Sequence, residues 1–442
     1  MLSLKHQFLC LIACCLAGTC LTACSDRSPS NPSGTPDAAS SKADTESANS
    51  MTIIRTLEER VRENPEDFIA YNKLSGYYLQ RMRETGDAKY LDLASRAAQA
   101  SLKILPAENN PGALGALAQV EFAAHNFTAA REHAAQLVAM EPRKAFPYQI
   151  LGESLLELGN YEQAAEVFEQ MQQWGGNGIG AQTRLARFDW VRGKTDNARR
   201  RLENALAQAL AEVPVSPETV SWCRWQSGEF AFALGRYEDA EQRYREALAD
   251  FPDYYRAIAG LARTLAARGD LTNAIIEAER AVRVLPDPTF VAFLGDLYRA
   301  SGRETEAQAQ YKLVEQIVRL NDLNGALYNR QLAVFYADHE IKTEEAYKLA
   351  SKEYEVRRDV YGADALAWAA VKTGRIPEAQ KAIQEALKLG TRDARLLYHA
   401  GMIARAAGDN SAAADYLKRA LNLSPQFDPI QVPLAHQALA VE

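Results

Sequence analysis

Residues 221–252 read SWCRWQSGEFAFALGRYEDAEQRYREALADFP. The segment contains two stretches in which apolar residues recur every three or four positions, and this period predicts two amphipathic helices. Gly235 separates the stretches, and glycine readily takes the left-handed conformation that ends a helix. Pro252 follows the second stretch, where proline stops a helix. The segment therefore predicts a helix–turn–helix unit.

The unit recurs along the chain with a nearly constant spacing. If Ser221 is position 1, alanine stands at position 20, and the same alanine is found at Ala130, Ala164, Ala198, Ala240, Ala274, Ala307, Ala346, Ala379 and Ala413. The units then start at 111, 145, 179, 221, 255, 288, 327, 360 and 394, and most spacings lie within one residue of 34. Such a period indicates stacked structural repeats. The two longer spacings predict insertions in the second helices after Ala205 and Val314, and a looser unit at 67–106 and a half-repeat helix at 52–63 precede the series.

Small and large residues occupy fixed positions of the unit. Glycine or alanine stands at positions 8 and 20, as at Gly228 and Ala240, and a large residue such as Tyr244 stands at position 24. This pattern resembles the tetratricopeptide repeat. The resemblance implies an all-α fold, a right-handed superhelical solenoid of about ten helix-turn-helix repeats. We expect the solenoid to span residues 52–428 and a C-terminal tail or short helix to occupy 429–442.

The N-terminus carries a targeting signal. Residues 1–23 read as a secretory signal peptide, and the motif LTAC at 21–24 resembles the lipobox of bacterial lipoproteins. The resemblance implies cleavage before Cys24 and its acylation, with palmitate among the acyl chains. Because Ser25 rather than aspartate follows, it implies the outer membrane, facing the periplasm. The alternative is an ordinary cleaved signal with a coincidental cysteine, and the Ser- and Pro-rich residues 24–51 predict a disordered linker.

Composition excludes several classes of function. The chain has 50 Lys and Arg against 57 Asp and Glu, so it has no overall basic field to hold a nucleic acid. It contains no zinc-protease, serine-hydrolase or phosphate-loop motif, and its six histidines are scattered. We therefore expect neither an enzyme nor a metal or other cofactor. Cys223, the lone cysteine outside the N-terminus, is expected to be a small buried hydrophobe.

The resemblance also implies a concave groove lined by positions 2, 5, 9, 12 and 13 of each unit. Eleven of these 45 positions are aromatic, about a quarter, against 9% of the whole chain. Charged residues there nearly balance, with Asp338, Asp364 and Arg395 among them. Enrichment in aromatic residues and arginine is typical of interface cores, although burial between repeats is the alternative for some rings. The predicted groove residues are Arg187, Trp190, Trp222, Trp225, Glu229, Arg256, Arg263, Arg299, Tyr328, Phe335, Tyr361, Trp368, Tyr398 and Arg405.

These features lead to a functional hypothesis. We expect a membrane-anchored periplasmic scaffold that holds an extended peptide or partner helix in its aromatic groove, in cell-envelope assembly or secretion. One patch surrounds Trp225 and a second surrounds Trp368. The alternative is a carbohydrate-binding scaffold of a polysaccharide export system, because aromatic platforms with arginines and carboxylates also suit sugar rings.

Overall fold

The computed structural model describes residues 38–323 and 330–440, and every regular element within them is helical. The all-α prediction is confirmed. The signal peptide, Cys24 and Tyr328 lie outside the described residues. The elements are α1 (Ala38–Glu63), α2 (Phe68–Thr85), α3 (Lys89–Ile104), the 3₁₀ turn η1 (Ala107–Asn109), α4 (Pro111–Ala123), α5 (Phe127–Met140), α6 (Ala145–Glu157), α7 (Tyr161–Gln173), α8 (Ile179–Val191), α9 (Thr195–Ala211), α10 (Pro217–Ala233), α11 (Tyr237–Asp250), α12 (Tyr255–Ala267), α13 (Leu271–Val284), α14 (Pro288–Ala300), α15 (Glu304–Leu323), α16 (Arg330–Asp338), α17 (Thr343–Tyr354), α18 (Val360–Lys372), α19 (Ile376–Leu387), α20 (Ala394–Ala406), α21 (Asn410–Leu423) and α22 (Gln431–Ala440).

The helices pair as the sequence period predicts. From α2–α3 to α20–α21, each first helix packs on its second helix, and each pair packs on the next. Most first helices begin at the predicted residue itself, although α10 begins four residues earlier, at Pro217. Helix α9 has 17 residues and α15 has 20, whereas α11 and α13 have 14 each, so the insertions do lengthen second helices. The solenoid prediction is therefore confirmed.

Small and large positions interlock inside and between the pairs. Tyr244 is fully buried, and a Cβ atom added to Gly228 or Gly260 would lie 2.6 or 2.5 Å from its ring. A Cβ atom added to Gly152 would likewise lie 2.5 Å from the ring of Phe168. Glycine at position 8 therefore makes room for the large residue at position 24, and close packing of this kind tolerates no extra methyl group without rearrangement.

The two ends of the described chain differ in how well they follow the prediction. Helix α1 begins at Ala38, inside the range 24–51 that was predicted to be a disordered linker, so that prediction is wrong for its second half. Alanine, lysine and glutamate in this stretch are good helix formers, and extending an existing helix is easier than nucleating a new one. Helix α22 lies where a tail or short helix was expected and packs on α20 and α21. None of the described helices combines the length and apolarity needed to cross a bilayer.

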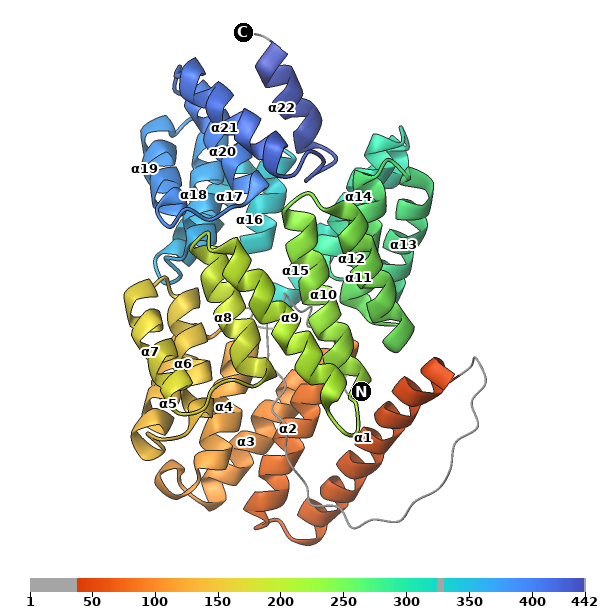
Figure 1. Ribbon diagram of the computed structural model, residues 1–442, viewed down its shortest axis with the longest axis vertical. Helices are drawn as coiled ribbons and strands as arrows, with labels where there is room; N and C mark the ends of the chain where they lie inside the picture. Colours follow the sequence, from red (N-terminus) through yellow and green to blue (C-terminus); the bar gives the residue numbers. More distant parts are fainter. Residues whose placement is uncertain (1–37, 324–329, 441–442) are drawn as a thin grey trace.

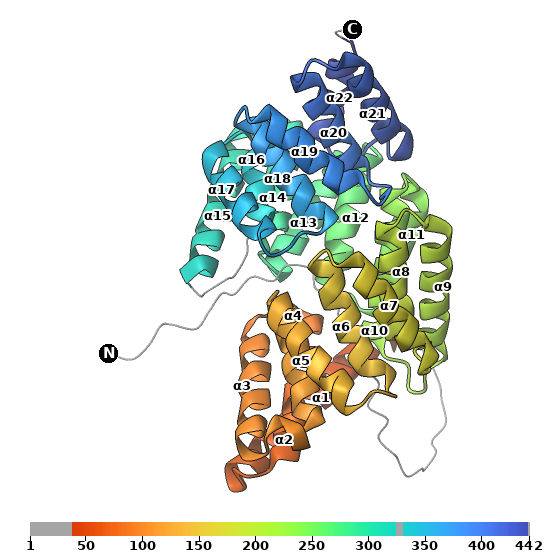
Figure 2. The same cartoon turned by 90° about the vertical axis from the view of Figure 1, so that its left-hand side faces the viewer.

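The solenoid turns tightly enough to touch itself. Figures 1 and 2 show α18 and α19 lying close to α6, α7 and α8, although more than a hundred residues separate them. The turns between α6 and α7, α8 and α9, and α10 and α11 contact the segments before α18, α20 and α22. We call this contact the seam; it comprises residues 159–161, 190–193 and 235–237 on one side and 357–361, 390–391 and 423–426 on the other.

Glycine makes the seam possible. Gly159, Gly193 and Gly235 have φ of 79°, 69° and 70°, as expected for turns that end a helix. Cβ atoms there would lie 2.3, 2.3 and 2.8 Å from the carbonyl oxygens of Arg358, Gly390 and Leu423, which belong to the facing segments. The backbones of successive turns of the superhelix therefore approach each other where only glycine fits.

Candidate binding cavity and the seam beside it

The first helices of the middle and last repeats surround an interior cavity. It consists of two adjoining spaces of about 480 and 610 Å³, a size common for ligand pockets. Helices α8, α10, α12, α14, α16, α18 and α20 contribute side chains to it. The residues that line both spaces are Trp225, Glu229, Arg263, Tyr361, Asp364 and Arg395.

About half of the predicted groove residues line this cavity. They come from positions 2, 5, 9 and 12 of successive repeats, which places these positions on the inner face of the solenoid. The predicted residues in the lining are Arg187, Trp190, Trp225, Glu229, Arg256, Arg263, Phe335 and Tyr361.

Other predicted groove residues belong to the hydrophobic core. Trp222, Trp368 and Tyr398 are only 4%, 2% and 1% exposed and pack in the large core cluster, so their assignment to an open groove is wrong. The cause is the tight curvature, which brings neighbouring first helices together; the Trp368 ring stacks on His399 with 4.2 Å between ring centroids. Phe335 is also 5% exposed, although it reaches the cavity wall.

Two predicted arginines lie away from the cavity. The Arg299 guanidinium lies 4.9 Å from the centroid of the Tyr311 ring and 3.7 Å from a carboxylate oxygen of Glu304. Arg405 is half-buried near the end of α20 and does not line either space.

The cavity also contains residues that the groove positions do not identify. Phe290 and Phe293 of α14, Asp287 before that helix, and Asp428 after α21 line it. Asp287 and Asp428 lie in segments between helices, which the five groove positions of the first helices do not cover. The sequence does indicate that Asp287 caps a helix, because aspartate directly before proline and threonine is typical of a helix N-terminus. In the structure its carboxylate accepts a hydrogen bond from Thr289 N–H at 2.8 Å.

One wall of the cavity combines arginines with aromatic rings. The Arg256 guanidinium lies 5.1 Å from the ring centroids of both Trp225 and Tyr255. Arg263 donates a hydrogen bond of 2.5 Å to Glu229, which also accepts one from the Tyr244 hydroxyl at 2.7 Å. Burial raises the pKa of Tyr244, and its hydroxyl therefore stays protonated as a donor. The charged groups of this wall are therefore paired or stacked within the protein.

The opposite part of the cavity is acidic. It contains Asp296, Asp338, Asp364, Asp393 and Asp428. Burial lowers the pKa of Arg395, but the charges of the last four outweigh that effect and raise it, and Asp296 lies near Asp428. We call this set of five aspartates the acidic end. Arg395 pairs directly with one of them, Asp428, at 2.9 Å.

Histidines contact two of these aspartates. His339 Nε2 lies 2.7 Å from an oxygen of Asp296. Burial alone would lower the pKa of His339, but the hydrogen bond and charge of Asp296 outweigh it and raise that pKa. His399 Nδ1 lies 2.9 Å from Asp364.

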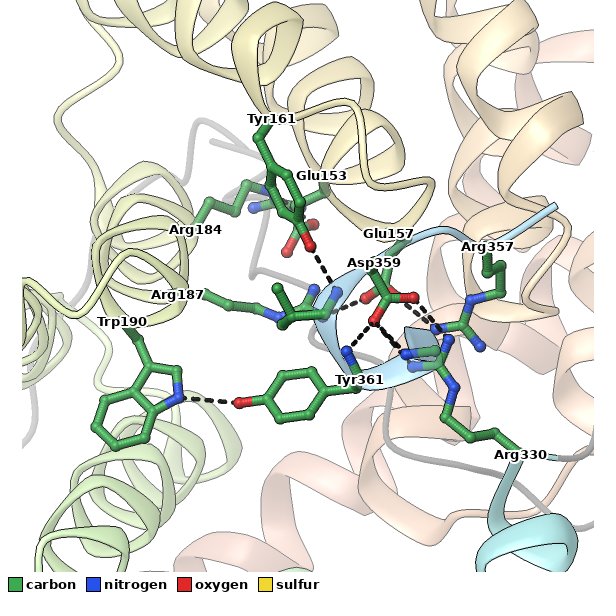
Figure 3. Close-up of polar contacts among 12 residues, drawn as sticks. Glu153, Glu157, Tyr161, Arg184, Arg187, Trp190, Arg330, Arg357, Asp359 and Tyr361 are labelled. Carbon is green, nitrogen blue, oxygen red and sulfur yellow. Dashed lines mark hydrogen bonds and ion pairs between the residues drawn. The ribbon is translucent and has the colours of Figure 1, made fainter. Parts of the chain in front are cut away.

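A buried network of ion pairs joins the cavity wall to the seam (Figure 3). Arg187 and Arg357 both bind the Glu157 carboxylate, Arg357 at 2.5 Å. Arg330 makes two hydrogen bonds to Asp359, of 3.0 and 2.6 Å. Burial alone would raise the pKa of Glu157, but the two guanidinium groups hold it well below its usual range.

Two tyrosines complete the seam (Figure 3). The Tyr161 hydroxyl accepts a hydrogen bond of 2.7 Å from the backbone N–H of Val360, at the start of α18. The indole N–H of Trp190 donates one of 3.1 Å to the Tyr361 hydroxyl. Trp190 and Tyr361 also line the cavity, so part of its wall is made by the seam itself. The described residues contain no group of three or more His, Cys, Asp or Glu that could hold a metal ion.

Comparison with known proteins supports the repeat assignment. A family model for the tetratricopeptide repeat matches residues 231–290, and a second model of the same description matches 116–177 and 365–426. The sequence matches no curated protein.

Three solved structures show a weaker similarity, each with a TM-score below 0.5. A thermophilic tetratricopeptide-repeat protein of Thermus thermophilus is 22% identical over 44% of this chain and 99% of its own, with a TM-score of 0.38. The human IFIT1 dimer with PPP-AAAA is 14% identical over 86% of this chain and 88% of its own, with a TM-score of 0.46. MamA protein is 14% identical over 40% of this chain and 91% of its own, with a TM-score of 0.30. The family-model matches and the regular pairing of the helices show that the chain contains tetratricopeptide repeats and folds as a tetratricopeptide-repeat solenoid.

Proposed function

We propose that the protein is a non-catalytic scaffold that binds an extended segment of a partner protein in its interior cavity. The observation that carries this proposal is the convergence of seven first helices on one space lined by both rings and charges. A folded domain is too large for this space, whereas an extended chain presents side chains and backbone groups in single file. Aromatic residues and arginine are the residue types that contribute most to binding at protein interfaces.

The wall chemistry suits a peptide. Trp225 and Tyr361 offer apolar faces, and Gln331 and Arg395 offer hydrogen-bond donors beside them. Much of the wall is already fixed by internal contacts, such as the bond between Arg263 and Glu229, so little side-chain entropy is lost when a ligand binds.

The proposal extends to the place where this binding occurs. The LTAC motif at 21–24 supports a lipid anchor on Cys24, and the Ser25 that follows supports the outer membrane, with the solenoid facing the periplasm. The scaffold would then serve cell-envelope assembly or secretion. Replacing Cys24 with serine should abolish labelling by radioactive palmitate and release the solenoid from the membrane fraction. Unchanged labelling would exclude acylation at this residue.

Site-specific photo-cross-linking tests the binding function. Gln331 lines the cavity and Gln308 is exposed on the second helix α15, so each is replaced in turn by p-benzoylphenylalanine in the full-length protein. We expect irradiation of cells to give a discrete cross-linked partner from position 331 and none from 308. The same partner from both positions, or none from 331, would contradict binding inside the cavity.

A glycan ligand is the alternative for the same cavity. The acidic end repels uronate polymers, which disfavours acidic polysaccharides. Fluorescence titration with neutral and acidic oligosaccharides tests this alternative. Saturable quenching that is lost in Trp225→Phe would move the proposed function to carbohydrate binding.

A further inference from the structure

The charges that line the cavity do not balance. Carboxylates outnumber arginines in the lining, which contains Glu229, Asp287, Asp296, Asp338, Asp364, Asp393 and Asp428 against Arg187, Arg256, Arg263, Arg330 and Arg395. Two of these arginines are already engaged by carboxylates that lie outside the lining. Arg187 binds Glu157, and Arg330 binds Asp359. His339 also lines the cavity and pairs with Asp296, but the carboxylates still outnumber the cationic groups, so the cavity carries an excess of negative charge.

The excess is greatest at the acidic end. Four of its aspartates lie around Arg395, which pairs directly with only one of them, Asp428, and the fifth, Asp296, contacts His339. Asp338 accepts hydrogen bonds from two uncharged donors, the Trp368 indole at 2.8 Å and the Gln431 amide at 2.7 Å. Negative charges inside a protein are costly unless a cation neutralises them.

A buried polar atom without a partner lies next to one of these aspartates. The His399 side chain is fully buried, and its Nδ1 is bound to Asp364. Its Nε2 makes no hydrogen bond and lies 4.0 Å from an oxygen of Asp338. Unsatisfied buried polar atoms are rare and each costs about 1–3 kcal/mol. Uncompensated charge at the acidic end therefore lies beside a buried nitrogen atom that makes no hydrogen bond, although His399 itself does not line the cavity.

Aromatic rings stand beside these carboxylates. Tyr361 and Phe293 line the cavity together with Asp364 and Asp338. An organic cation is attracted both by carboxylates and by the faces of such rings, whereas calcium and magnesium ions prefer surroundings of oxygen atoms. The geometry points to a guanidinium or ammonium side chain as the group that the acidic end receives.

We propose that the acidic end is a subsite for an arginine or lysine side chain of the bound segment. This inference rests on the proposed function and names the chemistry of its ligand. The cation would lie on the cavity side of Asp338 and Asp364, facing the ring of Tyr361, with the rest of the segment along the wall that Trp225 and Arg263 form.

Two peptides that differ only in charge test the proposal. The probes are acetyl-Gly-Phe-Arg-Phe-Gly-amide and its counterpart with citrulline, which has nearly the same shape as arginine but is neutral. Binding to the full-length protein is measured by calorimetry at low salt. We expect the arginine peptide to bind at least about tenfold more tightly, as charge-assisted contacts of this kind allow, and the difference to shrink as salt rises.

Variants locate the effect. Asp338→Asn keeps an oxygen for the Trp368 and Gln431 donors, so the fold is preserved while one negative charge is removed. The preference for arginine over citrulline should fall to about threefold or less in this variant. Asp415→Asn, on the exposed side of α21, is the control and should keep the full preference.

Three outcomes would overturn the inference. Equal binding of the two peptides to the unaltered protein, or a preference that Asp338→Asn leaves unchanged, would show that the acidic end selects no cation. If neither peptide binds at millimolar concentration, the acidic end is not a subsite for a guanidinium group, because the arginine peptide presents that group freely. The proposed function is judged separately, because cross-linking from position 331 captures a partner whatever its charge. A tetramer of glucosamine that binds more tightly than the arginine peptide would assign the subsite to a cationic sugar instead.

Discussion

The indole N–H of Trp190 donates a hydrogen bond to the hydroxyl of Tyr361 at 3.1 Å, although 171 residues separate the two in the chain. In an open solenoid each repeat contacts only its neighbours, and stability is close to a sum of local terms. Contacts across the seam connect the third to fifth helix pairs with the last repeats and with the segment before α22. We therefore expect this solenoid to unfold more cooperatively than an open one and its cavity to depend on the seam.

Replacing a seam glycine tests this dependence. Gly193 and Gly374 both have positive φ, of 69° and 77°, so alanine at either costs roughly 1 kcal/mol of backbone strain. At Gly193 the new Cβ would also lie 2.3 Å from the Gly390 carbonyl oxygen, whereas at Gly374 it would meet open space. We expect Gly193→Ala to lower the free energy of unfolding by about 2 kcal/mol more than Gly374→Ala, as overpacking does.

Urea unfolding followed by circular dichroism measures both variants. The Gly193→Ala transition should also become broader, or split into two, if the seam couples distant repeats. Equal losses in the two variants would mean that the seam does not contribute to stability in solution.

The buried carboxylate of Glu157 predicts a dependence on pH. Its pKa is held well below the ordinary 4.5 because Arg187 and Arg357 outweigh the effect of burial. A lowered carboxyl pKa contributes stability that is fully present above about pH 4.5 and is lost as pH falls toward the folded-state pKa. Glu157→Gln should therefore lower the free energy of unfolding at neutral pH by about 3 kcal/mol, because it leaves buried guanidinium groups uncompensated.

The matched control for Glu157 is an exposed ion pair. Glu203 pairs with Arg199 one turn away on α9, and its side chain is 55% exposed. Glu203→Gln should change the stability by less than about 0.5 kcal/mol at any pH, as is usual for surface pairs. Thermal unfolding from neutral to acidic pH should show a smaller loss of stability for Glu157→Gln than for the unaltered protein. Parallel losses in the two would show that other carboxylates dominate acid unfolding.

Much of the fold could be predicted because each repeat is specified locally. Alanine at position 20 gave the starts of α4, α6 and α20 to the residue. The seam could not be predicted in this way. Gly159 and Gly374 occupy the same position of the unit, yet only Gly159 meets another turn of the superhelix. The pitch that decides this contact is the sum of small rotations between many repeats, and no single repeat encodes it.

The site was predicted less well than the fold. Groove positions identified Trp225 and Tyr361, which do line the cavity. The same rule also selected Trp368, because it assumes an open concave face, and tight curvature buries that ring against His399. Asp428 follows the last repeat, where the rule does not apply. Position in a repeat therefore predicts which side a residue faces, but curvature decides whether that side is open.

The thiol of Cys223 should be unreactive in the folded protein. Cys223 is 1% exposed, and burial raises its pKa to about 12, so almost no reactive thiolate forms at neutral pH. N-Ethylmaleimide should leave the peptide that contains Cys223 unmodified in native protein and modify it fully in concentrated guanidinium chloride, as measured by mass spectrometry. A cysteine placed at the exposed Gln308 is the positive control. Rapid native labelling of Cys223 would indicate that α10 opens in solution.

Asp287 should make the protein less stable as pH rises through the weakly acidic range. Burial raises its pKa from the ordinary 3.8 to about 6, although the hydrogen bonds from Thr289 oppose this shift. The folded state therefore binds this proton more tightly than the unfolded chain. Its contribution to stability is greatest below about pH 4 and falls by up to roughly 3 kcal/mol by about pH 6.

Replacing Asp287 with asparagine removes the buried charge and keeps a side-chain oxygen for the Thr289 N–H, since asparagine is as good a helix cap as aspartate. Asp287→Asn should therefore raise the free energy of unfolding near pH 7.5 and change it little near pH 4.5, as urea titrations at the two pH values would show. Asp270→Asn, at the exposed cap of α13, should show no such gain at the higher pH, because the pKa of Asp270 is lowered by its hydrogen bonds with Asn273. If Asp287→Asn destabilises the protein equally at both pH values, the Asp287 carboxylate is neutralised by a partner in solution. The interior cavity, which this residue lines, would then be less acidic than the structure indicates.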